Sequence, residues 1–121
     1  MPCTELGRPL WHDLTVKDAT RIVPFYEAVC GWKASEHDMG DYVDFDMTTK
    51  DGDRVAGLCQ ARHDNAAVPP VWMMYVAVQS LQDALAQVAL YGGDVVAERH
   101  GVFAIVRDPA GAHLALWEQR A

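Results

Sequence analysis

Two ionisable residues, Asp13 and His113, are the side chains of this sequence best placed to act together chemically. Each lies in a stretch that alternates like a strand, so that residues two apart share a face. A carboxylate and an imidazole that meet can serve as a general acid or base. The alternative is a structural hydrogen bond, or two solvated groups, with no chemistry between them.

Strand alternation also predicts which side chains accompany this pair. We expect His12 on the opposite face of its strand, with Leu14 and Val16, packed toward a helix. Trp11 and Thr15 share the face of Asp13, and Ala115 and Trp117 share the face of His113. One face of a strand near residues 71–78 adds Met73, Tyr75 and Ala77. This set is rich in aromatic and sulfur groups.

An internal repeat supplies the elements that carry these residues. Val16 ends a strand, Asp18 is a candidate helix cap, and Gly31 is a candidate helix end. The same landmarks recur 62 positions later, as Val78, Ser80 and Gly93. Three landmarks at one offset indicate a duplication.

Apolar residues at helical spacing predict the buried face of each helix. In the first half these are Ile22, Phe25, Tyr26 and Val29. In the second half they are Leu81, Ala84, Leu85 and Val88, after a weak capping box formed by Ser80 and Asp83.

Each helix is followed by room for three strands, so the sequence predicts an α+β fold of two strand–helix–three-strand modules. Module one covers about residues 8–62, a linker 63–70, and module two about 71–119. Because neither half would bury enough surface alone, we expect residues 1–121 to form a single domain.

The net charge of −7 is spread along the chain and argues against nucleic-acid and anionic-membrane partners, which need clustered basic residues. No apolar run approaches the roughly 18 residues of a membrane span. Cys3, Cys30 and Cys59 form no C-x-x-C pair, which favours reduced thiols. We expect a cytoplasmic protein in which Cys30 and Cys59 are core residues.

Two segments resemble the vicinal oxygen chelate superfamily, which includes glyoxalase I, bleomycin- and fosfomycin-resistance proteins and extradiol dioxygenases. The first is Trp11-His12-Asp13-Leu14-Thr15-Val16-Lys17-Asp18, with Phe25-Tyr26 and Gly31-Trp32 after it. The second is Asp108-Pro109-Ala110-Gly111-Ala112-His113-Leu114-Ala115-Leu116-Trp117. The chain looks most like short hydroxylase-like or mycobacterial-antigen-like members. The resemblance implies paired βαβββ modules in an open, cup-shaped barrel, and a homodimer.

The resemblance also implies metal-ligand positions, normally His or Glu, on strands one, four, five and eight. At the first, fifth and eighth positions this chain has Trp11, Met73 and Ala115, and the fourth strand offers only Cys59. We therefore expect no cofactor, the family metals Zn, Ni, Mn and Fe included. A non-standard metal site is the alternative, drawn from His12, Asp13, His113 or Glu118.

These observations predict a cup that binds a small aromatic or amphipathic organic molecule. Its predicted ligand-binding residues are Trp11, Thr15, Met73, Tyr75, Ala115 and Trp117. An enzyme of small-molecule metabolism is the alternative, either metal-free with Asp13 and His113 as catalytic residues, or a lyase or dioxygenase with a non-standard metal. A third interpretation is an interaction protein with a filled cavity.

Overall fold

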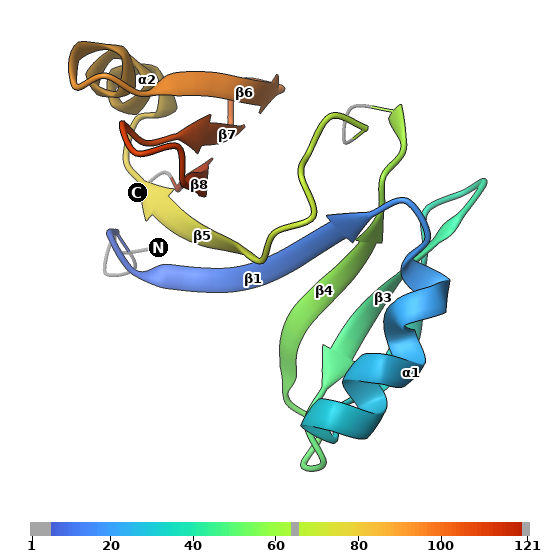
Figure 1. Ribbon diagram of the computed structural model, residues 1–121. Helices are drawn as coiled ribbons and strands as arrows, with labels where there is room; N and C mark the ends of the chain where they lie inside the picture. Colours follow the sequence, from blue (N-terminus) through green and yellow to red (C-terminus); the bar gives the residue numbers. More distant parts are fainter. Residues whose placement is uncertain (1–5, 64–65, 120–121) are drawn as a thin grey trace. The chain divides into compact units, whose positions relative to one another are not determined.

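The computed structural model describes residues 6–63 and 66–119, which contain two helices and eight strands. In chain order the elements are β1 (Pro9–Val16), α1 (Ala19–Cys30), β2 (Lys33–Asp38), β3 (Val43–Thr48), β4 (Arg54–Gln60), β5 (Met73–Val78), α2 (Leu81–Leu90), β6 (Asp94–Arg99), β7 (Phe103–Arg107) and β8 (His113–Glu118). The order βαβββ occurs twice, which confirms the predicted α+β fold (Figure 1). Neither helix in the described part of the chain is long and apolar enough to cross a membrane.

The chain divides into two compact units, each built around one helix. The α1 unit is His12–Trp72, and the α2 unit combines Met1–Trp11 with Met73–Ala121. Strand β1 therefore begins in the α2 unit and ends in the α1 unit. The predicted single domain with one shared cup stays a prediction.

The two units have the same sheet topology. Hydrogen bonds join β2-β3-β4-β1 in that order in one unit and β6-β7-β8-β5 in the other. The central pairs β1–β4 and β5–β8 are parallel, and the remaining pairs are antiparallel. Val16 pairs with Gln60, and Val78 pairs with Glu118, so the duplicated strands also keep an equivalent register.

Each unit has a core between its helix and one face of its sheet. In the α2 unit the predicted stripe Leu81, Ala84, Leu85 and Val88 packs on β5, β7 and β8, as expected. In the α1 unit the packed stripe is Ala19, Ile22, Val23 and Tyr26. Phe25 and Val29 are 58% and 65% exposed, so that part of the predicted stripe is wrong. The stripe retains its spacing but starts one turn earlier, at Ala19.

The helix ends are partly as predicted. Gly31 ends α1 in a left-handed conformation (φ 71°), and the Ser80 hydroxyl accepts a hydrogen bond from the Asp83 amide at 3.2 Å. Asp18 occupies the cap position of α1 but makes no side-chain cap bond. The Gln60 side-chain oxygen accepts from the Ala19 amide instead, at 2.9 Å.

The cysteine prediction is wrong for Cys30, which is exposed at the last residue of α1, and Cys59 is only partly buried. Cys3 lies outside the described residues.

Candidate ligand-binding site

The α2 unit presents one sheet face away from its helix. Val76, Val78, Leu114 and Leu116 pack toward α2, so alternate residues of β5 and β8 point the other way. The predicted site residues on this helix-free face are Met73, Tyr75, His113, Ala115 and Trp117. The structure brings them together in register, with Tyr75 opposite Ala115 and Ala77 opposite Trp117.

Three aromatic residues give this face its character. The rings of Tyr75 and Phe103 stack with centroids 5.4 Å apart and planes at 30°. Phe103 pairs directly with Trp117 across β7 and β8, and Trp117 is 48% exposed. The Arg99 guanidinium lies 5.9 Å from the Phe103 ring centre. Phe103 and Arg99 were not among the predicted site residues, although alternation along β7, whose Ala104 and Val106 pack toward α2, places Phe103 on the helix-free face.

The other predicted binding residues differ in accessibility. Met73 and Ala115 are buried, at 2% and 0% exposed, and Thr15 is 8% exposed. Trp11, the last residue of β1 that belongs to the α2 unit, is half-buried. Of the predicted binding residues on the helix-free face, Trp117 therefore offers the most open aromatic surface.

His113 lies beside an ion pair at one end of this face. It pairs with Arg107 across β7 and β8, and Arg107 binds the Asp94 carboxylate through two nitrogens. The hydrogen bond from Arg107, and to a smaller extent the positive charges of Arg107 and His113, lower the pKa of Asp94. His113 is thus close enough to influence a carboxylate within its own unit.

Asp13 lies on the helix-free face of the α1 unit, because its neighbour Leu14 belongs to the helix-facing core. It pairs with Gly57 on β4, and Thr15 pairs with Cys59. Since Asp13 belongs to one unit and His113 to the other, their meeting stays a prediction.

Cys59 is held as a neutral thiol. Burial is the main cause that raises its pKa, and the charges of Asp13, Asp44 and Asp46 and a hydrogen bond to Asp44 add to it. A metal ion would have to displace the proton of this thiol in order to bind it.

The donor chemistry does not fit the metal that the superfamily uses. Trp11, Met73 and Ala115 supply neither carboxylate nor imidazole, which leaves Cys59 as the one possible donor among the four positions. Among residues 6–63 and 66–119, no group of three or more His, Cys, Asp or Glu side chains is arranged to hold a metal ion. Glu118, a candidate for an altered metal site, has a structural contact instead.

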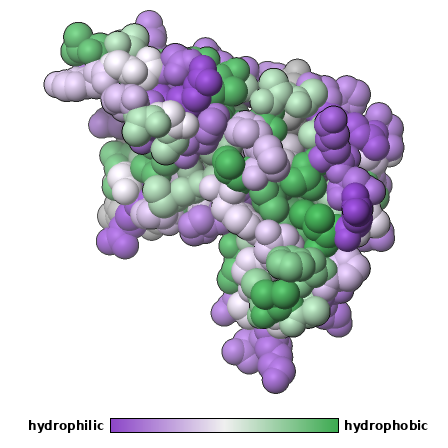
Figure 2. All heavy atoms as spheres, in the orientation of Figure 1, coloured by the Kyte–Doolittle hydropathy of each residue, from purple (hydrophilic) through white to green (hydrophobic). Residues whose placement is uncertain are grey.

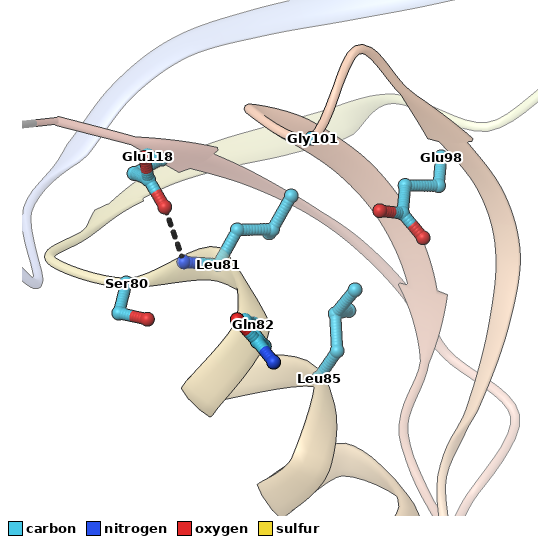
Figure 3. Close-up of a pocket in the computed structure, with 7 residues that line it drawn as sticks. All are labelled: Ser80, Leu81, Gln82, Leu85, Glu98, Gly101 and Glu118. Carbon is cyan, nitrogen blue, oxygen red and sulfur yellow. Dashed lines mark hydrogen bonds between the residues drawn. The ribbon is translucent and has the colours of Figure 1, made fainter.

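That contact lies at the start of α2. A Glu118 oxygen accepts from the Leu81 amide at 2.8 Å, in a pocket of about 430 Å³ between α2 and the strands β6 and β8 (Figure 3). Leu85 forms an apolar wall, and the Glu98 carboxylate points toward the leucines in this view. In the α1 unit, the neutral Gln60 occupies the equivalent place on β4. Each module thus uses its last strand to cap its helix, a contact over 37 or 41 residues.

Comparison with known proteins gives matches over most of the chain. A family model described as "Glyoxalase-like domain" matches residues 11–117. The chain is 28% identical over 119 residues to CFP32 of Mycobacterium tuberculosis, which covers 93% of this chain and 46% of that protein. It is 30% identical over 135 residues to the anthracycline biosynthesis protein DauV of Streptomyces sp. strain C5, covering 93% of this chain and 47% of DauV. The chain spans about half the length of these curated relatives.

Solved structures share the fold at low identity. Methylmalonyl-CoA epimerase from Mycobacterium tuberculosis is 17% identical, with a TM-score of 0.59 and coverage of 100% of this chain and 94% of that one. A glyoxalase/bleomycin resistance protein/dioxygenase superfamily member from Vibrio splendidus 12B01 is 13% identical, with a TM-score of 0.54 and coverage of 90% and 97%.

Proposed function

The chain belongs to the family of glyoxalase-like domains, as its resemblance to the superfamily predicted, and from this premise we propose that it binds a small aromatic or amphipathic organic molecule without a metal. The observation that carries the proposal is the aromatic group Tyr75, Phe103 and Trp117 on one sheet face, where Trp117 is half exposed. Rings held on adjacent strands are pre-oriented to stack on a flat guest.

The metal-free part of the proposal rests on donor chemistry. The superfamily's ligand positions carry indole, thioether and methyl groups in this chain, which bind apolar carbon better than they bind a divalent ion. Relatives named for anthracycline biosynthesis support an aromatic ligand class, since anthracyclines contain fused planar rings.

The test is a titration of an anthracycline with the protein in the presence of a chelator, in which the fluorescence anisotropy of the anthracycline reports binding. We expect saturable binding, and Trp117→Ala should weaken it by about fivefold to thirtyfold, because a stacked aromatic contact contributes about 1–2 kcal/mol including its buried area. Tyr91→Ala, which removes an exposed aromatic ring at the end of α2, outside the helix-free face, is the matched control and should leave the affinity unchanged. If Trp117→Ala binds as well as the native chain, the aromatic face is not the site.

A second candidate function is metal-free proton transfer by Asp13 and His113. It is favoured by one observation: each of the two lies on the helix-free face of its own unit. The anthracycline titration reports binding alone, so this candidate is tested by the coupling between Asp13 and His113 in a double-mutant cycle.

A further inference from the structure

The α1 unit contains a second aromatic site, on the side of its sheet that faces the helix. The indoles of Trp32 and Trp72 line a pocket of about 340 Å³ together with His12, Val55 and Ala56. This volume lies within the range of small-ligand pockets. The lining includes His12, which strand alternation placed on the helix-facing side, and it shares no residue with the helix-free faces.

Tyr26 holds the two indoles in fixed orientations. Its ring stacks on Trp32 with centroids 5.9 Å apart, and its hydroxyl accepts a hydrogen bond from the Trp72 ring nitrogen at 3.1 Å. The two indoles are nearly perpendicular, at 79° and 6.0 Å. A guest therefore meets rings that are already ordered, which lowers the entropic cost of binding.

The cluster lies at the surface and is not simply core filling. Trp72 is 38% exposed, and the neighbouring Phe25 packs edge-on to Tyr26 while remaining 58% exposed. Figure 2 shows apolar residues gathered over α1. Exposed aromatic surface beside a pocket is typical of a binding site more than of a packed interior.

Charge selects the kind of guest. Between His12 and Trp72 the sequence has eleven acidic and six basic residues, and none of the five residues that line the pocket is Lys or Arg. Glu27, next to Tyr26 in α1, accepts a hydrogen bond from the Ala34 amide at 3.1 Å. The faces of indole rings are themselves negative and attract cations.

We propose that this pocket, formed by Trp32, Trp72 and His12, binds a small organic cation such as a quaternary ammonium group. The positive group rests on the indole faces, and its alkyl substituents contact Val55 and Ala56. Such a site is independent of the ligand proposed for the helix-free face of the α2 unit.

The four tryptophans allow a site-resolved test with choline as the probe. Two-dimensional NMR of the ¹⁵N-labelled chain gives one indole signal for each of Trp11, Trp32, Trp72 and Trp117. Choline should shift the signals of Trp32 and Trp72 and leave the other two in place. Its uncharged carbon analogue, 3,3-dimethylbutan-1-ol, should bind about threefold to thirtyfold more weakly, because it lacks the cation–π attraction.

A charge variant supplies the matched control. His12 is exposed, so His12→Lys should preserve the fold while placing a fixed positive charge in the lining. We expect it to weaken choline binding at least about threefold. His37→Lys makes the same charge change on β2, outside the pocket, and should alter the affinity less than about twofold.

Three results would each overturn the proposal: no choline-dependent indole shift, equal binding of the neutral analogue, or equal effects of the two lysine variants. A choline-dependent shift confined to Trp11 and Trp117 would also overturn it, by placing the cation at the other site. Anthracycline binding that depends on Trp117 is a separate result and stands or fails independently.

Discussion

Replacing Gln60 with alanine should destabilise the α1 unit far more than replacing Glu118 destabilises the α2 unit, although the two residues are equivalent in the duplicated fold. Gln60 is 7% exposed. Its oxygen accepts from the amide of Ala19, a fully buried residue, and its nitrogen donates to the Val43 carbonyl at 3.2 Å and to the Thr20 hydroxyl at 3.3 Å.

The magnitude follows from the groups that lose their partners. Gln60→Ala leaves the Ala19 amide and the Val43 carbonyl without that partner in a region that water reaches poorly, which costs about 1–3 kcal/mol for each group. We expect a total of about 2–6 kcal/mol. Glu118 is half-buried beside a pocket that admits water, so in Glu118→Ala water can replace the lost cap of Leu81 at a cost of about 1 kcal/mol.

Urea unfolding gives the two free energies of unfolding, and amide hydrogen exchange assigns each loss to a unit. In Gln60→Ala the amide of Ala19 should lose its protection, while the amide of Leu81 keeps it. Gln60→Glu is a useful companion, because it retains the acceptor but loses both donors. Equal costs for the two alanine variants, or an Ala19 amide that exchanges as slowly as in the native chain, would refute this reasoning.

Three further predictions concern other parts of the chain. The raised pKa of Cys59 means that the folded thiol stays neutral while the unfolded thiol ionises near pH 9. The free energy of unfolding should therefore fall above that pH, by up to about 1.4 kcal/mol per pH unit. Cys59→Ala should remove this contribution to the pH dependence in unfolding experiments at about pH 8–10.5. A Cβ at position 93 would lie 2.4 Å from the Arg107 carbonyl oxygen, so Gly93→Ala should lower the unfolding free energy by about 1–3 kcal/mol, and an unchanged midpoint in urea would contradict the close packing. If Asp13 and His113 act on one ligand, a double-mutant cycle of Asp13→Asn and His113→Gln should show a coupling of at least about 0.5 kcal/mol in the binding free energy, whereas strictly additive effects would separate them.

Local patterns were sufficient to predict the architecture. Alternation in β1, the stripe of α2 and the spacing from Val16 to Val78 all correspond to elements of the structure, because each depends on residues close in sequence. The predicted equivalence of Gly31 and Gly93 as helix ends was wrong, because α2 ends at Leu90 with Tyr91 at its cap position, and the left-handed backbone follows at Gly92. Gly31 has a left-handed backbone in open space, whereas Gly93 allows a close approach of the β7 backbone.

Contacts between distant residues were not predictable in the same way. Asp18 has the right type and place for a helix cap, but the cap of α1 comes from Gln60, 41 positions from the amide that it binds. The exposure of Phe25 was missed because the apolar spacing of α1 permits two stripes, and only packing against β3 and β4 selects the one that includes Ala19. The pairing of Trp72 with Tyr26 likewise depends on where the linker ends.

The most direct test of the central claim combines elemental analysis of the purified chain with aromatic-ligand titration before and after chelator treatment. Metal-free binding predicts no stoichiometric Zn, Ni, Mn or Fe and the same affinity in both titrations. One bound metal ion per chain, together with loss of ligand binding after chelation, would contradict it.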